Sequence, residues 1–189
     1  SDKATHLIEP MAQIAWGERK KAIVYADESE NTESDMGNLF SISRYLASDQ
    51  FETGLHGAYG LRYNYHTNTN ITGGEFSFGQ VIRFSEEPGF TNSSGLGEEK
   101  SDIFLAAQLF LPYASYVSFQ GLIDNKLNTK KTDFNAGFKY KAIFLDTNYS
   151  FLQPDIEEHR LNPIEEWTLK TGYEINDNWQ LGSNLRYDE

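Results

Sequence analysis

Apolar and polar residues alternate along most of this chain with a period of two, which is typical of β-strands that have one apolar and one polar face. The segment 51–65 shows the pattern most clearly. One parity carries Phe51, Leu55, Tyr59, Leu61, Tyr63 and Tyr65, and the other carries Glu52, His56, Arg62 and Asn64. Because the alternation recurs in segment after segment, the sequence predicts an all-β protein in which many strands share one apolar face.

The alternation predicts nine strands, separated by segments that contain turn-forming residues. They span residues 5–16, 51–65, 72–84, 102–112, 116–127, 133–141, 143–152, 166–175 and 179–187. Long and short connections alternate, as they do in outer-membrane barrels, where extended loops lie outside the cell and brief turns lie in the periplasm. Greek-key sandwiches have no reason to alternate in this way. We therefore expect an antiparallel transmembrane outer-membrane β-barrel, of which these nine strands are a part.

The sequences of two connections lead to further predictions. Residues 17–36 are highly charged and lack a sustained period, so we expect an exposed, mobile loop there. Residues 176–178 read Asn-Asp-Asn, which favours a tight hairpin turn. On the barrel interpretation this turn lies on the periplasmic side.

Composition excludes several classes of protein. No run approaches the roughly 20 apolar residues that a spanning helix needs, and mean hydropathy is -0.58. A membrane barrel remains compatible with that value, since every second residue of a spanning strand is polar. The net charge of -12 argues against nucleic acid as a partner, because phosphate binding needs clustered Lys and Arg. The segment has no cysteine, so it contains neither a disulfide nor a thiolate metal site.

The polar face carries charges of both signs, which suits a hydrated lumen where ions face water or cross-strand partners, and equally a lumen that encloses another protein. The lumen-facing candidates are Glu52, His56, Arg62, Glu75, Arg83, Lys139, Asp146, Lys170, Glu174 and Arg186. Aromatic residues near the strand ends favour membrane-interface girdles, although a sandwich core or rim would also accommodate them. They are Trp16, Tyr65, Phe84, Tyr113, Trp167, Trp179 and Tyr187.

No catalytic or metal-binding constellation stands out. His56 shares the polar face with Ser77 and Ser118, yet no spacing indicates the base and orienting group that nucleophilic catalysis requires. The acidic pairs in the loops lack the spacing of a calcium-binding loop, and Gly95-Leu96-Gly97 lacks the strand-to-helix context of a phosphate loop. We therefore expect no enzyme activity, no catalytic residues, no metal and no cofactor.

Several short motifs occur in the order and spacing of one known family. They are LIEPMAQ at 7–13, NLF at 38–40 followed by Arg44-Tyr45, SFGQ at 77–80 with Phe84, SGL at 94–96 followed by Ser101-Asp102, and DNW at 177–179 with Tyr187-Asp188. In this order they resemble the C-terminal barrel of the LPS-assembly outer-membrane protein family, LptD, also called organic solvent tolerance protein. Gln50 and Asn178 depart from the Arg that the family often carries at those points.

The resemblance implies a function and a set of partners. It implies a non-enzymatic barrel in the outer membrane of a Gram-negative bacterium, which assembles lipopolysaccharide into the outer leaflet. The implied partners are lipopolysaccharide, the outer-membrane lipids and an LptE-like plug lipoprotein inside the lumen. It also implies that residues 1–189 are an interior portion of the barrel domain, without the N-terminal periplasmic domain, the family's cysteines or the remaining strands.

Two alternatives remain open from the sequence. A general porin or substrate channel needs the same alternation in a complete, self-closed barrel. A soluble β-sandwich of the carbohydrate-binding type also alternates apolar and polar residues, and it predicts a chain that folds in water without detergent.

Overall fold

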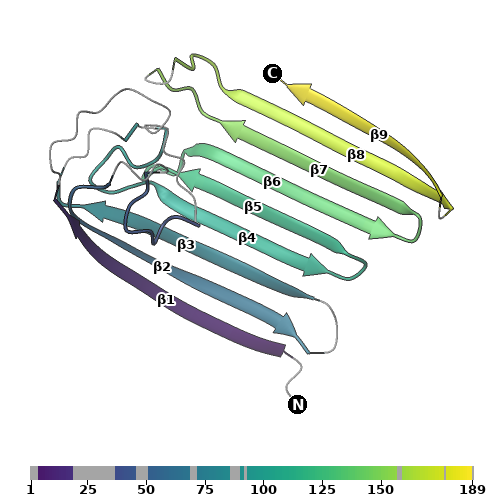
Figure 1. The fold of residues 1–189 in the computed structure, drawn as a ribbon, viewed down its shortest axis with the longest axis horizontal. Coiled ribbons are helices and arrows are strands. Elements are labelled where there is room, and N and C mark those ends of the chain that lie inside the picture. The colour runs from purple at the N-terminus through teal and green to yellow at the C-terminus, as the bar shows by residue number, and fades with distance from the viewer. Residues whose placement is uncertain are drawn as a thin grey trace.

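A computed structural model describes residues 4–18, 37–45, 51–68, 72–85, 90–91, 93–156, 159–176 and 178–188. These residues form nine strands in a single sheet, in which each strand pairs antiparallel with its sequence neighbours (Figure 1). The strands are β1 (Ala4–Gly17), β2 (Gly54–Thr67), β3 (Gly73–Arg83), β4 (Ile103–Leu111), β5 (Ser115–Ile123), β6 (Thr129–Tyr140), β7 (Ile143–Leu152), β8 (Ile164–Asn176) and β9 (Trp179–Asp188). The predicted strand number and antiparallel order are confirmed, and a sandwich of two sheets is not what these residues form.

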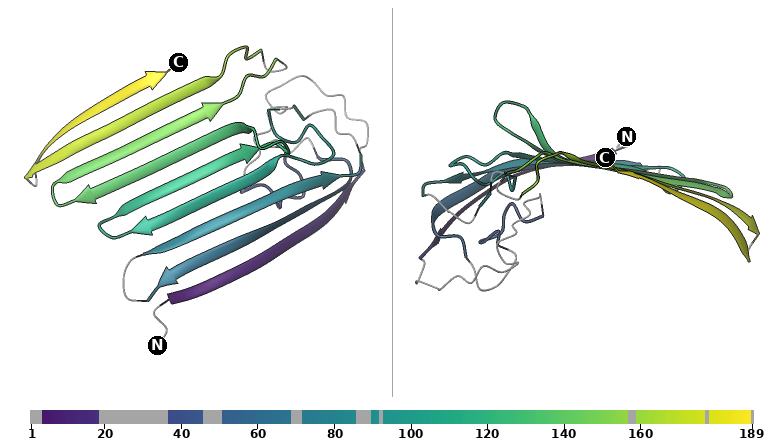
Figure 2. Two further views of the ribbon diagram at one scale, coloured as in Figure 1. Left: turned by 180° about the vertical axis from the view of Figure 1, so that it is seen from behind. Right: turned by 90° about the horizontal axis from the view of Figure 1, so that it is seen from above.

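The sheet is open and curved, with β1 and β9 at its two edges (Figure 2). Its strands contain between 9 and 14 residues, and a transmembrane strand needs about 9–11 residues when it is tilted. Every strand is therefore long enough to cross the hydrocarbon region of a bilayer. No helix among the described residues could serve as a membrane span.

The connections divide the sheet into two ends, as the lengths of the predicted loops indicate. We call the end that carries residues 18–53, 84–102, 124–128 and 153–163 the long-loop end. The opposite, turn end carries residues 68–72, 112–114, 141–142 and 177–178. The predicted hairpin turn is present between β8 and β9, where the side chain of Asn176 accepts a hydrogen bond of 3.0 Å from the backbone N–H of Asn178. The expected mobile loop at 17–36 lies almost wholly outside the described residues.

The fifth and sixth strands differ from the sequence prediction. We expected strands at 116–127 and 133–141, whereas β5 ends at Ile123 and β6 begins at Thr129. Asp124 causes the early turn, because its carboxylate accepts backbone N–H groups from Lys126 and Asn128, each at 2.8 Å. An Asp that bonds to its own following backbone forms a local turn in place of a strand ladder.

The two faces of the sheet differ in the exposure of their apolar side chains. The face that carries Ile14, Leu55, Leu145 and Leu185 presents large apolar groups to the surroundings, with Ile14 81% exposed. Large apolar side chains on this face are exposed from β1 to β9, while Gln80 at the long-loop end is covered by Asn125 of the β5–β6 turn. The apolar core of the described residues lies instead on the polar face, as a small cluster at the long-loop end.

Candidate functional site: the polar face and its cap

Nine of the ten lumen-facing candidates lie on one face of the sheet, and the tenth, Glu52, precedes β2 and pairs with Arg83 of that face. The register places His56 opposite Arg83, and Asp146 opposite Lys170. Figure 2 shows that the sheet curves and that the segment 37–45, drawn in dark blue, lies on its concave side. Because this segment contacts the polar face, as described below, the polar face is the concave one.

Residues 37–45 and 93–102 fold over the polar face of β2–β5 at the long-loop end, and we call these two segments the cap. Leu39 of the cap packs where a Cβ on Gly79 would lie, and Phe40 packs over Gly60 with its Cζ 3.2 Å from the corresponding position. A Cβ at residue 79 would collide with Leu39 of the cap, and a Cβ at residue 60 would collide first with the carbonyl oxygen of Phe78 in β3, so both positions favour glycine. The cap therefore packs closely against β2 and β3.

The cap and the wall share one apolar cluster. Its buried members are Leu39, Tyr45, Ala58, Val81, Phe90, Leu96, Phe104 and Leu122, with Phe40 partly buried against them. Leu39 and Leu96 come from the cap, while Val81, Phe104 and Leu122 come from strands and have the parity of the polar face. The sequence contained a signal for this contact, because these apolar residues break the alternation in neighbouring strands.

A buried charged cluster joins the cap to the wall. Glu52 is 3% exposed, and its carboxylate accepts hydrogen bonds from Arg44 of the cap and from Arg83 of β3, whose Nε and Nη2 lie 3.1 Å from Oε1. Arg44 also donates to the carbonyl of Leu39 at 3.0 Å. Arg83 donates to the carbonyl of Leu96, and it stacks over the ring of Phe90 at 4.2 Å.

His56 and Ser43 complete this cluster. The Nε2 of His56 lies 3.1 Å from the carbonyl of Ile42 and 3.7 Å from Glu52 Oε2. The hydroxyl of Ser43 accepts the backbone N–H of Glu52 at 3.2 Å. Arg44 and Arg83 form hydrogen-bonded ion pairs with the same carboxylate, so two cations share one buried anion. Such charges are stable in a buried site only when they are paired and hydrogen-bonded.

Ser101 and Gln80 hold the second cap segment to β3. The backbone N–H of Val81 donates to the hydroxyl of Ser101 at 2.8 Å, and Ser101 returns its N–H to the carbonyl of Val81 at 2.9 Å. Gln80 donates to the carbonyl of Ser101 at 2.7 Å and accepts a hydrogen bond from Tyr59. Ser101 thus extends the β3–β4 hydrogen bonding ahead of the first residue of β4, with its backbone N–H and its hydroxyl.

Asp102 and Gly95 define the turn within this segment. Gly95 has a φ of +73°, which favours glycine, and its carbonyl accepts the N–H of Asp102 at 2.8 Å. Burial raises the pKa of Asp102, while Lys130 at 2.8 Å opposes that shift. The sequence motifs around residues 38–45, 77–80, 94–96 and 101–102 therefore meet in one place, although they are distant along the chain.

Outside the cap, the polar face carries cross-strand pairs of polar side chains. Hydrogen bonds or ion pairs join Tyr116 to Asp146 at 2.6 Å, Asn148 to Asn135 at 2.7 Å, Ser150 to Asp133 at 2.8 Å, Lys139 to Glu174 at 2.8 Å, Arg186 to Glu166 at 2.8 Å, and Arg62 to Glu75 at 3.4 Å. These charged groups are partly exposed. The surface is hydrophilic and the polar groups of these pairs already have partners, so it can be wetted without binding any one solute tightly.

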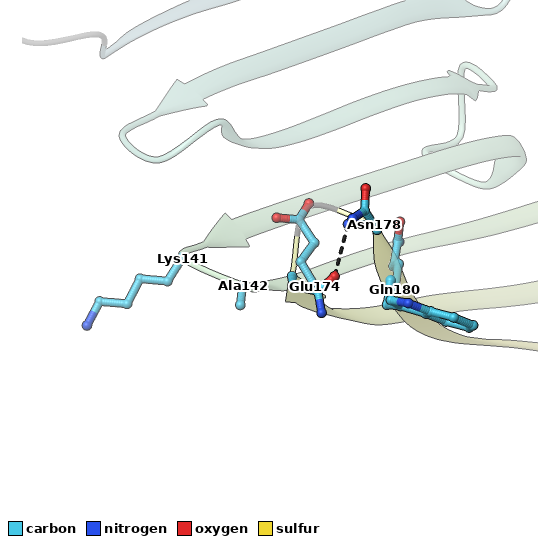
Figure 3. Close-up of a pocket in the computed structure, with 7 residues that line it drawn as sticks. Lys141, Ala142, Glu174, Asn178 and Gln180 are labelled. Atoms are coloured by element: carbon cyan, nitrogen blue, oxygen red, sulfur yellow. Dashed lines mark hydrogen bonds between the residues drawn. The ribbon is translucent and has the colours of Figure 1, made fainter.

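Among the described residues, this face contains at least two open hollows. One, of about 230 Å³, is bordered by Gly37 of the cap and by Arg62, Glu75, Gln108 and Gln120 of the wall. The other, of about 530 Å³, lies at the turn end between the β6–β7 and β8–β9 hairpins and is lined by Glu174, Asn178 and Gln180 (Figure 3). Lys141 also borders this hollow, and its side chain extends away from the other residues drawn (Figure 3).

The predicted interface aromatics lie near both ends of the sheet. Trp16, Phe84, Trp167 and Tyr187 lie near the long-loop end, and Tyr65, Tyr113 and Trp179 lie near the turn end. Tyr113 has a φ of 62° and packs edge-on against Tyr140 at 5.2 Å. Their assignment to membrane interfaces stays a prediction.

His56 contacts a backbone carbonyl and Glu52 under the cap, instead of activating a serine hydroxyl. No group of three or more His, Asp or Glu side chains in the described ranges is placed to hold a metal ion. The sequence analysis named Arg44, Gln80 and Ser101 only as motif residues and did not predict their contacts, which depend on the position of the cap.

A curved antiparallel sheet with an accessible apolar convex face and a polar concave face is the wall of a membrane β-barrel. The comparison with protein families makes the identification specific. The family model described as LptD, LPS transport system D, matches residues 1–179. The chain therefore belongs to the LptD family, outer-membrane β-barrel proteins of Gram-negative bacteria that act in lipopolysaccharide transport. Neither the curated proteins nor the solved structures contained a match.

Proposed function

We propose that this segment is part of the wall of a barrel that delivers lipopolysaccharide to the outer leaflet of the outer membrane without enzymatic chemistry. The observation that carries the proposal is the division of one nine-stranded sheet into an exposed apolar face and a hydrated polar face, in a chain of the LptD family. Membrane lipids contact the apolar face. The glycan part of lipopolysaccharide passes along the polar face.

The chemistry of the polar face supports passage of the lipopolysaccharide glycan more than tight binding of that glycan. Hydrogen bonds join Asn148 to Asn135 and Ser150 to Asp133 across strands. These side chains therefore need no ligand to satisfy their hydrogen-bonding groups. A glycan can exchange hydrogen bonds with such a surface and with water at similar free energy. The proposal includes an LptE-like lipoprotein as a plug within the lumen. It also includes further strands and a periplasmic domain beyond residues 1–189.

Site-specific photo-crosslinking in cells tests this function. A photoreactive amino acid is placed at Asn148, on the polar face, and separately at its neighbour Thr147, on the opposite face. Newly made, pulse-labelled lipopolysaccharide is expected to crosslink first at 148 and only later, from the outer leaflet, at 147. Capture at 147 before 148, or no capture at 148, would contradict the proposed route.

A further inference from the structure

We propose that two neighbouring hairpins at the turn end form a binding site for the phosphate group of a membrane glycerophospholipid, in which Lys141, Tyr113 and Tyr140 are the binding residues. The acyl chains of this lipid lie on the apolar face beside the site. The inference rests on the proposed function only for the contact of the apolar face with lipid. It concerns a bound phospholipid, which is separate from the route of lipopolysaccharide.

The three side chains come together from the β4–β5 and β6–β7 hairpins (Figure 1). The ring of Tyr140 packs edge-on against the ring of Tyr113 at 5.2 Å, and the ammonium group of Lys141 lies 5.2 Å from the centre of the same Tyr140 ring. Tyr113 is 67% exposed and Tyr140 is 41% exposed, so the cluster is open to its surroundings. An ammonium group and two phenolic hydroxyls are hydrogen-bond donors, and phosphate oxygens accept strong bonds from charged donors.

The backbone of both turns has a conformation that is costly for the residues it carries. Tyr113, Ala114 and Lys141 have φ values of 62°, 51° and 52°, and they are three of the five non-glycine residues with positive φ in the described ranges. Tight hairpin turns favour Gly, Asn or Asp at such positions. Because strained residues of this kind concentrate at functional sites, a tyrosine and a lysine in adjacent strained turns point to a role for their side chains.

Two lysines at the end of β6 have different surroundings. Lys139 lies on the polar face, where its ammonium group is 2.8 Å from the carboxylate of Glu174. Lys141 reaches the ring of Tyr140, whose parity places it on the apolar face. Within the described ranges no carboxylate forms an ion pair with Lys141, and Figure 3 shows its side chain extended away from Glu174. Lys141 is therefore available to an anion on the lipid side of the turn end.

The apolar face beside the cluster favours an anion that carries acyl chains. Phe138 and Ile143 continue this face from Tyr140 toward the middle of the sheet, and they are 47% and 53% exposed. A free phosphate ion would leave both side chains uncovered. A glycerophospholipid covers them with its chains and brings its phosphate to the turn end, the depth at which lysine and tyrosine side chains meet a membrane interface.

The test measures the affinity of phosphatidylethanolamine by native mass spectrometry of the intact barrel, which is isolated with its partner and freed of lipid in detergent. We expect Lys141→Gln to weaken binding of the first lipid molecule about tenfold, because one charge-assisted hydrogen bond to phosphate is lost. Lys139→Gln removes the same charge from the opposite face, so it is the matched control and should bind the lipid as wild type does. Equal affinities for Lys141→Gln and wild type would overturn the inference.

A second variant separates the role of the side chain from that of the turn. Glycine adopts a φ of 52° without strain, so Lys141→Gly should keep or raise the Tm in lipid-free detergent while its affinity for the lipid falls as in Lys141→Gln. Lys141→Arg keeps the cation and should restore binding. A lower Tm for Lys141→Gly, with lipid binding unchanged, would assign Lys141 to the turn alone and contradict the proposal.

Competition identifies the source of the phosphate. Excess inorganic phosphate should leave the phospholipid bound, because the free ion makes no contact with the apolar face. Displacement of the lipid by inorganic phosphate would contradict the phospholipid assignment. Displacement by lipopolysaccharide at a lower concentration than by phosphatidylethanolamine would place the cluster on the transport route and overturn the claim of a separate site. Failure of the crosslinking at residue 148 would concern the transport route alone.

Discussion

At the scale of single residues, two glycines on the polar face each lie beneath an aromatic ring of a neighbouring strand. The ring of Tyr116 lies over Gly137, and the ring of Phe144 lies over Gly172. An aromatic ring that covers a glycine shields the backbone and packs where the glycine lacks a side chain. The aromatic rings at the turn end of the concave face therefore lie flat on the sheet.

This arrangement predicts unequal effects for two directly paired glycines. Gly172 and Gly182 are register partners, but a Cβ at 172 would collide with the Phe144 ring, whereas one at 182 would meet only the carbonyl of Thr171 at 3.4 Å. We expect Gly172→Ala to destabilise the barrel by about 1–3 kcal/mol through overpacking, and Gly182→Ala to change little. The temperature at which the barrel loses its heat-modifiable gel mobility measures both, and equal shifts would contradict this account.

The hydroxyl of Tyr116 supports a second residue-scale prediction. It donates to Asp146 at 2.6 Å between strands that are not adjacent. Tyr116→Phe removes the donor but keeps the ring over Gly137, so we expect a loss of about 1 kcal/mol and no change in the mobility of the folded barrel. Urea unfolding in detergent measures that loss; a stability equal to wild type would mean that water replaces the hydroxyl fully.

At the scale of elements, the turn between β5 and β6 depends on one carboxylate. Hydrogen bonds from the side chain and backbone of Asn128 lower the pKa of Asp124. Because the folded-state pKa is depressed, the stabilisation is present above the ordinary value of 3.8 and is lost as pH falls through the folded-state value. We therefore expect the turn to open in acid.

Pepsin cleavage measures this opening, since Leu127 in the turn is 79% exposed. Cleavage near Leu127 should rise as the pH falls below 3.8. Asp124→Asn supplies an amide oxygen that can accept the same backbone hydrogen bonds and cannot titrate, so cleavage of that variant should lack the step. If cleavage rises in the same step in the wild type and in Asp124→Asn, a group other than Asp124 causes the opening.

The strands also show how much of this structure the period-two alternation of apolar and polar residues can predict. The alternation predicts the number, order and faces of the strands, because each strand shows it whatever contacts the strand makes with residues distant in the sequence. It misplaces the boundary after Ile123, where Asp124 captures the backbone locally. Val81, Phe104 and Leu122 appear as interruptions of the pattern, and only the docked cap explains them. The partners of Glu52 were not predictable, since Arg44 reaches it from a segment without a period.

At the scale of the whole molecule, the exposed apolar face determines how an isolated segment behaves. Trp16, Trp179 and Ile14 are 69%, 70% and 81% exposed, and β1 and β9 have free edges. Such surfaces and edges associate in water. We expect residues 1–189 alone to aggregate without detergent, as sedimentation would show. A soluble monomer with a sharp unfolding transition would argue against a membrane-facing sheet.

The central claim is that the convex face contacts lipid and the concave face contacts water, and labelling along β8 tests it most directly. Single cysteines at Thr168, Leu169, Lys170 and Thr171 are introduced into the intact barrel in cells and treated with a hydrophilic thiol reagent. The account predicts labelling at 168 and 170 and protection at 169 and 171, since neighbouring side chains point to opposite faces. Uniform labelling, or protection at 168 and 170 with labelling at 169 and 171, would contradict it.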